Sequence, residues 1–304
     1  MLQLYPDRFI LLPHSQTRFL TIIKLNLIFV ISRKRGVLFK LTEKHDILTV
    51  EGIKNCLNTR FIGADIYLFD AIDSTNSHAH KLAKEGVQNG TVVLSESQSK
   101  GKGRLGRTWF SPSGANIYLS VIIKPQMPST QITLLTFAAA IAVAKAIRDI
   151  AGLDADIKWP NDILIKGKKV AGILSEMDAK SDTIRFVVIG IGINVNLDKK
   201  DIPSELMDKA TSIKIESNSA IDRMNLICRV LENLEKWYNL FERNGANDII
   251  KEWKSLAITI GRDVKVQSGN SFVEGRAVDI DENGALLIKD RNGVIQKVLS
   301  GDVI

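Results

Sequence analysis

Residues 98–109, with the sequence QSKGKGRLGRTW, concentrate four cations and three glycines in one short segment. Glycine lets the backbone approach an oxyanion closely, and lysine and arginine neutralise phosphate or carboxylate charge. The composition therefore predicts an anion-binding loop. Considered alone, the segment could also be a solvated basic surface loop.

Two nucleotide-binding motifs have a spacing similar to this loop. Gly101, Gly103 and Gly106 satisfy a dinucleotide-binding fingerprint, and residues 101–108 imitate a P-loop with arginine in place of its lysine. Both motifs need a helix directly after the glycines, because the helix N-terminus holds the phosphates. Residues 111–114 are Ser-Pro-Ser-Gly, where a helix cannot begin and continue. Neither motif is predicted.

Two further segments carry polar groups suited to a cleft. Residues 158–162, Lys-Trp-Pro-Asn-Asp, predict a rigid corner that presents Asn161 and Asp162, although such a corner could be purely structural. Lys169 begins an apolar strand, from which a lysine can project one fixed charge into a cleft.

Taken together and in order, these segments resemble the catalytic domain of biotin protein ligases over roughly residues 50–304. The motifs that carry the resemblance are Ser74-Thr75-Asn76, the glycine-rich loop at 101–109, the corner at 158–162, Lys169 ahead of Ala-Gly-Ile-Leu, and Gly-Ile-Gly-Ile-Asn at 190–194. Lys102 replaces the first arginine of the family's loop, which keeps the charge but loses the bidentate fork.

The resemblance implies a role for each motif residue. Biotin would be bound by Ser74, Thr75, Asn76, Gln98, Lys102, Gly103, Arg104 and Lys169, of which Arg104 and Lys169 would also act in catalysis. The nucleotide would be bordered by Gly101, Gly106, Arg107, Trp109, Asn161 and Asn194, and Asp162 is the candidate contact for Mg²⁺. The family forms biotinyl-5'-AMP from biotin and ATP, then transfers biotin to a lysine in the carrier domain of a biotin-dependent carboxylase. No protein nucleophile is needed, because biotin supplies the attacking carboxylate.

Three other functions stay open. A bifunctional ligase and transcriptional repressor is favoured by the basic residues 33–35, but no recognition helix with its turn is recognisable near them, so DNA binding is not predicted. A lipoate or octanoyl transferase shares the general fold, but the basic loop and the 158–162 corner argue against it. A non-catalytic sensor would bind biotin without forming AMP. The sequence does not decide whether the chain forms a homodimer.

The elements that position these residues indicate an α+β fold, with a mixed sheet, packed helices and, by the resemblance, a class II synthetase-like catalytic domain. Strands are predicted at 61–69, 91–94, 117–123, 163–165, 169–176 and 184–195, and helices at 75–84, 134–150, 221–241 and 247–256. After Gly261, three turn signals in a short span predict a small five-stranded SH3-like β-barrel.

These patterns divide the chain into an N-terminal appendage at 1–45, a catalytic domain at 46–257 and the SH3-like domain at 258–304. The appendage shows no clean helical or strand period. Its apolar run at 19–31 contains Lys24 and Asn26 and is shorter than the ~20 residues of a membrane helix, so no membrane association is predicted.

Composition sets only broad limits. Hydrophobic residues at 45% and charged residues at 25% are ordinary globular values, and the net charge of +7 fits an anionic partner or a mildly basic enzyme equally well. Cys56 and Cys228 are too few for a disulfide framework, which favours a reducing cytoplasm. His78 and His80 are two residues apart on a predicted helix and point to different faces, so they predict no metal site.

Overall fold

The structure is a computed structural model. It describes residues 19–24, 27–32, 38–41 and 47–303, and in the last of these ranges residues 181, 182 and 270 are left out. The chain forms two compact units, Met1–Ile47 and Leu48–Ile304. How the second unit divides into a catalytic domain and an SH3-like domain at residue 257 stays a prediction.

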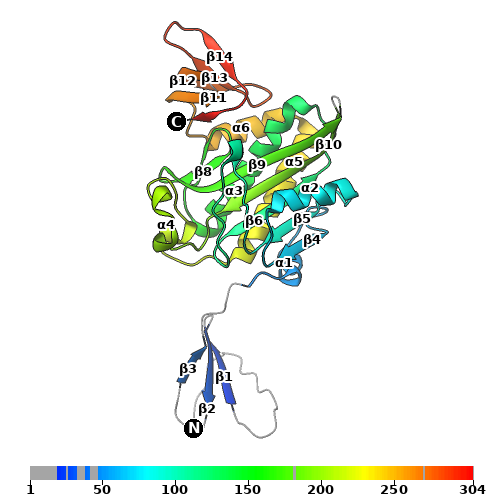
Figure 1. The fold of residues 1–304 in the computed structure, drawn as a ribbon, viewed down its shortest axis with the longest axis vertical. Helices are drawn as coiled ribbons and strands as arrows, with labels where there is room; N and C mark the ends of the chain where they lie inside the picture. Colours follow the sequence, from blue (N-terminus) through cyan, green and yellow to red (C-terminus); the bar gives the residue numbers. More distant parts are fainter. Residues whose placement is uncertain are drawn as a thin grey trace. The chain divides into compact units, whose positions relative to one another are not determined.

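The first unit contains a three-stranded antiparallel sheet in the order β1-β2-β3, formed by Phe19–Lys24, Leu27–Ser32 and Leu38–Leu41 (Figure 1). No strand was predicted here, because the segment shows no clean strand period. Its apolar run is rich in β-branched residues, which favour strands even without alternation, and Lys24 ends the first of the two strands. The basic residues 33–35 lie outside the described residues.

The second unit is built on a seven-stranded mixed sheet in the order β4-β5-β6-β10-β9-β8-β7. Its strands are β4 (Ile66–Phe69), β5 (Val92–Ser95), β6 (Ile117–Ile123), β7 (Asp156–Lys158), β8 (Asp162–Ile165), β9 (Lys168–Lys180) and β10 (Thr183–Ile193). Strands β4 and β5 are parallel, and the other pairs are antiparallel. β4 is shorter than predicted because Gly63, at φ +82°, turns the chain before it.

Helices cover both faces of this sheet. On one face α2 (Thr75–Glu85) packs Ala79 and Ala83 against Val93 and Val188. The other face holds α3 (Ile132–Ala151), which is covered in turn by α5 (Arg223–Asn244) and α6 (Ala246–Leu256). The shorter helices are α1 (Val50–Cys56) and α4 (Ile213–Ser217).

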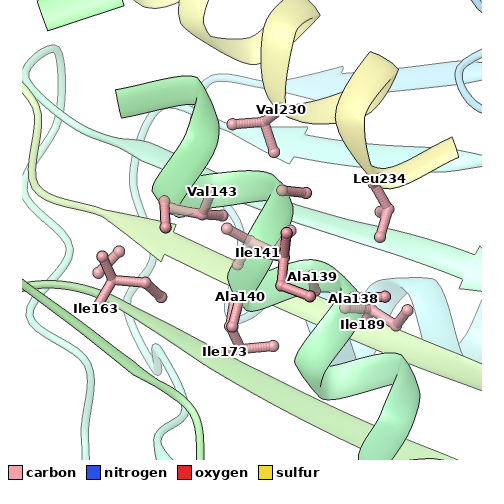
Figure 2. Close-up of a cluster of buried hydrophobic side chains, with 14 of the residues drawn as sticks. Ala138, Ala139, Ala140, Ile141, Val143, Ile163, Ile173, Ile189, Val230 and Leu234 are labelled. Atoms are coloured by element: carbon pink, nitrogen blue, oxygen red, sulfur yellow. The ribbon is translucent and has the colours of Figure 1, made fainter. Parts of the chain in front are cut away.

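Helix α3, predicted at 134–150, supplies much of the core. Figure 2 shows its residues between Ile173 and Ile189 of the sheet and Val230 and Leu234 of α5. The segment Ser129–Ala151 is long and apolar enough to cross a membrane by length and composition, but 67% of its apolar window is buried inside the protein. Its apolar surface is therefore used in packing.

The C-terminal residues form a five-stranded antiparallel sheet of the SH3-like kind, in the order β14-β13-β12-β11-β15 (Figure 1). Its strands are β11 (Asp263–Ser268), β12 (Ser271–Ile280), β13 (Leu286–Lys289), β14 (Ile295–Val298) and β15 (Asp302–Val303). Trp159 of the 158–162 corner hydrogen-bonds to this part of the chain. Its backbone N–H donates to Thr259 Oγ1, ahead of β11, at 2.9 Å, and its Nε1 donates to Gly284 O, between β12 and β13, at 3.1 Å.

The two cysteines differ from the expectation. Cys56 on α1 and Cys228 on α5 are joined by a disulfide across a sequence separation of 172 residues. The two cysteines are far apart in the sequence, but the packing of α1 on α5 brings them together. The bond disagrees with the argument for a reducing compartment drawn from cysteine content.

Candidate functional site

One cavity of about 240 Å³ lies where the 98–110 loop, the N-terminus of α2, strands β9 and β10, the 197–210 segment and Asp302 meet. All the predicted site residues line it except Gly101 and Gly106. Gly101 instead packs against the protein, since a Cβ there would lie 2.4 Å from Trp109 O. Gly106 is at φ +74° beside the exposed Leu105, at the loop's tip. These two glycines shape the loop and do not reach the cavity.

The biotin-motif residues sit at the start of α2. Ser74 is the N-cap residue, and its side chain accepts from Ser77 N at 3.5 Å while the residue lines the cavity. Gln98 is held in a fixed orientation, because its Oε1 accepts from Thr75 N at 2.8 Å and its Nε2 donates to Ser111 Oγ at 3.0 Å. The network presents hydroxyl and amide groups in defined directions.

Asn76 is buried beneath these groups. Its Nδ2 donates both hydrogens to protein acceptors, to Leu174 O at 3.2 Å and to Glu176 Oε2 at 2.8 Å. Its Oδ1 lies 2.6 Å from the hydroxyl of Ser120, which donates to it. Any hydrogen bond from a ligand to Asn76 is therefore limited to the remaining lone pair of Oδ1.

Two glycines of β10 make room for polar and aromatic groups against the sheet. A Cβ at Gly190 would lie 2.0 Å from Asn76 Oδ1, and a Cβ at Gly192 would lie 2.6 Å from the Trp109 indole. These glycines face the cavity opposite Leu174 and Gly172 of β9. The glycine-rich strand thus forms the floor on which Asn76 and Trp109 lie.

The loop arginines contact the C-terminal sheet. Nη1 of Arg104 donates to Asn161 Oδ1 at 3.0 Å and to Gly301 O at 3.2 Å, and it lies 3.4 Å from Asp302 Oδ1. Arg107 also pairs with Asp302. Burial lowers the pKa of the Arg104 guanidinium, while the charges of Asp302 and Asp162 oppose that shift. The group stays protonated, since an arginine pKa is far above neutrality.

Lys169 stands at the start of β9. Its Nζ lies 2.6 Å from Asp162 Oδ1 and 5.3 Å from the centre of the Trp109 ring. Among the described residues, no group of three or more His, Cys, Asp and Glu side chains is placed to hold a metal ion. The carboxylates that line the cavity, Asp162 and Asp302, are both paired with cations.

Several residues at the site were not predicted, among them Asp302 and Lys209 in the cavity lining and Ser111, Ser120 and Glu176, which hydrogen-bond or pair with lining residues. Ser120 carried a usable signal, because a hydroxyl in the middle of the fully buried strand β6 requires a partner. Asp302 carried none, since nothing in the sequence indicates that β15 approaches the loop.

The geometry joins two kinds of surface. The apolar walls are formed by Ile191, Leu197, Ile202 and Leu206. The positive charge comes from Lys102, Arg104, Arg107, Lys169 and Lys209. A cavity of this kind suits an apolar acid placed beside phosphate groups.

Known proteins share these features. A family model described as "Biotin/lipoate A/B protein ligase family" matches residues 68–194, and one described as "Biotin protein ligase C terminal domain" matches residues 259–304. The bifunctional ligase/repressor BirA of Bacillus spizizenii is 40% identical over 271 residues, which cover 89% of this chain and 82% of that protein. The chain belongs to the biotin protein ligase family.

Other members of the family support the same assignment for this ligase. The biotin--[acetyl-CoA-carboxylase] ligase of Mycobacterium tuberculosis is 34% identical over 76% of this chain and 85% of its own. The biotin protein ligase of Aquifex aeolicus, solved in complex with biotin and ATP, superposes with a TM-score of 0.69 at 29% identity and covers 79% of this chain and 98% of its own. The resemblance seen in the sequence is confirmed.

Proposed function

We propose that this ligase converts biotin and ATP to biotinyl-5'-AMP and pyrophosphate, and then transfers biotin to a lysine in the carrier domain of a biotin-dependent carboxylase. One observation carries the proposal: a single cavity places the Ser74-to-Asn76 and Gln98 polar network next to the cations of the 98–109 loop and Lys169. The solved Aquifex aeolicus relative holds biotin and ATP, the two substrates that this arrangement suits.

The cations address the main obstacle to the first half-reaction. A carboxylate oxygen of biotin attacks the α-phosphorus, the bond to pyrophosphate breaks, and negative charge gathers on the phosphate oxygens. Lys169, Lys102 and Arg104 would offset the repulsion between the two anions. Lys169 would exchange its Asp162 partner for substrate oxygens, at a distance that its flexible stem can cover.

Adenine and biotin would occupy different parts of the cavity. Trp109 lines the cavity, and its buried Nε1 has no hydrogen-bond partner among the described residues, so the indole would have to shift before it could donate to a ligand. Asn161 and Asn194 are oriented by Ile173 O and Thr211 O, at 2.6 Å and 3.0 Å, and border the nucleotide side. Both amides are thereby fixed before a substrate enters.

In the second half-reaction, the neutral acceptor amine attacks the carbonyl carbon of the mixed anhydride. An amide bond forms, the acyl C–O bond to the phosphate breaks, AMP leaves, and the proton released from the amine passes to solvent. Mg²⁺ can enter as a partner of the nucleotide phosphates and would add positive charge there. The two carboxylates of the cavity are already paired with Lys169 and with the loop arginines, so the protein offers no ready magnesium cage. The reaction would take place in the cytoplasm, which supplies the ATP, although a disulfide such as Cys56–Cys228 is rare in a reducing compartment.

Mass spectrometry of a carrier domain tests this function. The full chain, incubated with ATP, Mg²⁺, biotin and the carrier, should add the mass of one biotin and release AMP. Lipoate in place of biotin should add nothing. AMP formation without modification, biotin binding without AMP, or transfer of lipoate would each contradict the proposal in a recognisable way.

A repressor role is a second candidate, because the Bacillus spizizenii relative is named as a bifunctional ligase and repressor. Footprinting of the full chain on DNA upstream of its own biotin genes, with biotin and ATP at about physiological salt, tests it. Protection of one defined sequence would establish the role, and binding that is independent of sequence would reject it.

A further inference from the structure

Glu176 lies on β9 two residues beyond Leu174, outside the set of residues that line the cavity. Its two carboxylate oxygens nevertheless contact two residues that do line it. Oε2 accepts from Asn76 Nδ2 at 2.8 Å, and Oε1 lies 3.7 Å from Lys102 Nζ. One carboxylate therefore links the floor of the cavity to the glycine-rich loop.

The two contacts differ in character. Asn76 is 3% exposed and is held additionally by Ser120 and Leu174, so the Glu176 carboxylate completes a buried network. The Lys102 side chain is 44% exposed and stands on a loop between two glycines, beside the Glu176 side chain, which is 36% exposed. Holding this side chain before biotin binds reduces the entropy lost on binding.

We propose that Glu176 is a positioning residue for biotin, which orients Asn76 and holds Lys102 at the same end of the cavity. It sets biotin affinity without touching biotin. The inference rests on the proposed function, because biotin must occupy this part of the cavity.

Two substitutions separate the two contacts. Glu176→Gln keeps an oxygen that can accept from Asn76 but removes the charge beside Lys102, whereas Glu176→Met removes both. By calorimetry, the biotin Kd should rise about threefold for the first variant and more than about tenfold for the second, given the usual strengths of exposed ion pairs and charge-assisted hydrogen bonds. The Kd for ATP should stay close to that of the parent in both variants. The midpoint of thermal unfolding should stay close to the parent's in Glu176→Gln and fall in Glu176→Met, because Asn76 Nδ2 then loses a buried acceptor.

A double-mutant cycle tests the link to the loop. In a Lys102→Met background, Glu176→Gln should change the biotin Kd by less than about 1.5-fold, because the charge has lost its partner. Asp178→Asn is the matched control: it removes one charge two residues further along β9, where Asp178 pairs with Arg185 and does not line the cavity. This variant should bind biotin like the parent.

Three results would overturn the inference. These are an unchanged biotin Kd in both Glu176 variants, independent effects of Glu176 and Lys102 in the cycle, and equal losses of biotin and ATP binding with a lowered unfolding midpoint. Failure of the parent protein to bind biotin would instead overturn the proposed function, and this inference with it.

Discussion

Lys169 lines the cavity and has two neighbours that favour its charge. The structure places its ammonium beside the Asp162 carboxylate and above the face of Trp109, where both groups stabilise positive charge. The side chain is partly exposed to the cavity, so substrate oxygens can replace the carboxylate. Lys169 is therefore suited to stabilise charge that develops during adenylate formation.

Lys169→Gln should lower the single-turnover rate of biotinyl-5'-AMP formation by roughly a hundredfold, as other losses of a transition-state charge partner do. Biotin affinity should fall much less, because Thr75, Gln98 and the loop remain. Quench-flow with labelled ATP measures the rate, and Lys180→Gln, at the exposed far end of β9, is the control. A rate equal to the parent's would remove Lys169 from the chemistry.

Two glycines of strand β10 lie under different groups of the cavity. Gly190 and Gly192 of β10 leave space on the cavity face of the sheet, and a different group fills the space over each glycine. Asn76 lies over Gly190 and Trp109 lies over Gly192. In the proposed function, one strand would therefore support both the biotin side and the nucleotide side.

Substitution of each glycine should affect one side more than the other. Gly190→Ala should displace Asn76 and weaken biotin binding, while Gly192→Ala should displace Trp109, weaken ATP binding and alter the indole fluorescence. Each added methyl should also cost about 1–3 kcal/mol of stability by overpacking. Calorimetric Kd values for both substrates decide the matter, and each variant is the other's control. If both variants lost affinity for biotin and for ATP to the same extent, the two glycines would not support separate parts of the cavity.

Helix α5 is tied to the end of β5 by a buried ion pair. The Arg223 side chain is 1% exposed, and its two terminal nitrogens reach Glu96 at 2.7 Å and 3.1 Å. Arg223 also donates to Asn116 O at 3.0 Å. Removal of one partner would leave the other charge uncompensated in a poorly solvated place.

Arg223→Met should therefore lower the free energy of unfolding by about 3–5 kcal/mol in urea titrations. Arg229→Met, on the same helix but 45% exposed, should lower it by less than about 1 kcal/mol. If the two variants were equally stable, the buried pair would not be a main support of α5.

At the scale of the whole molecule, the C-terminal sheet takes part in the site. Asp302 on β15 lines the cavity and pairs with Arg104 and Arg107. Trp159 makes a second contact with this part of the chain, through its hydrogen bond to Gly284 O. A residue of the C-terminal sheet, and not only the seven-stranded sheet, therefore contacts the glycine-rich loop.

Asp302→Asn should loosen the loop and release biotinyl-5'-AMP about tenfold faster, which corresponds to the loss of one charge-assisted interaction. Retention of labelled adenylate after dilution measures this rate. Asp263→Asn, an exposed carboxylate of the same sheet, should retain the adenylate like the parent. An unchanged release rate for Asp302→Asn would separate the C-terminal sheet from loop control.

The N-terminal unit, Met1–Ile47, should be dispensable for both half-reactions, because every site residue lies in the second unit. Removal of residues 1–44 should leave adenylation and transfer within about twofold of the parent, since a separate unit contributes little to the stability of the remainder. Removal of residues through Ile66–Phe69 should prevent folding, because it deletes a strand of the main sheet. A shortened chain that folds but cannot biotinylate a carrier would place the N-terminal unit in the active enzyme.

What the sequence determined by itself was local or periodic. Helix α3 followed from its continuous apolar and alanine-rich composition, and β6 followed from a run of β-branched and aliphatic residues, because such patterns depend on neighbours in the chain. The motif residues could likewise be assigned to one site, since their order and spacing are typical of the family.

Contacts between distant segments were decided only by the tertiary structure. The bond between Cys56 and Cys228, the pairing of Asp302 with the loop arginines, and the Glu176 link between Asn76 and Lys102 each join residues that carry no shared local pattern. Their partners depend on which helix packs where and on strand register, and these follow from the whole core at once.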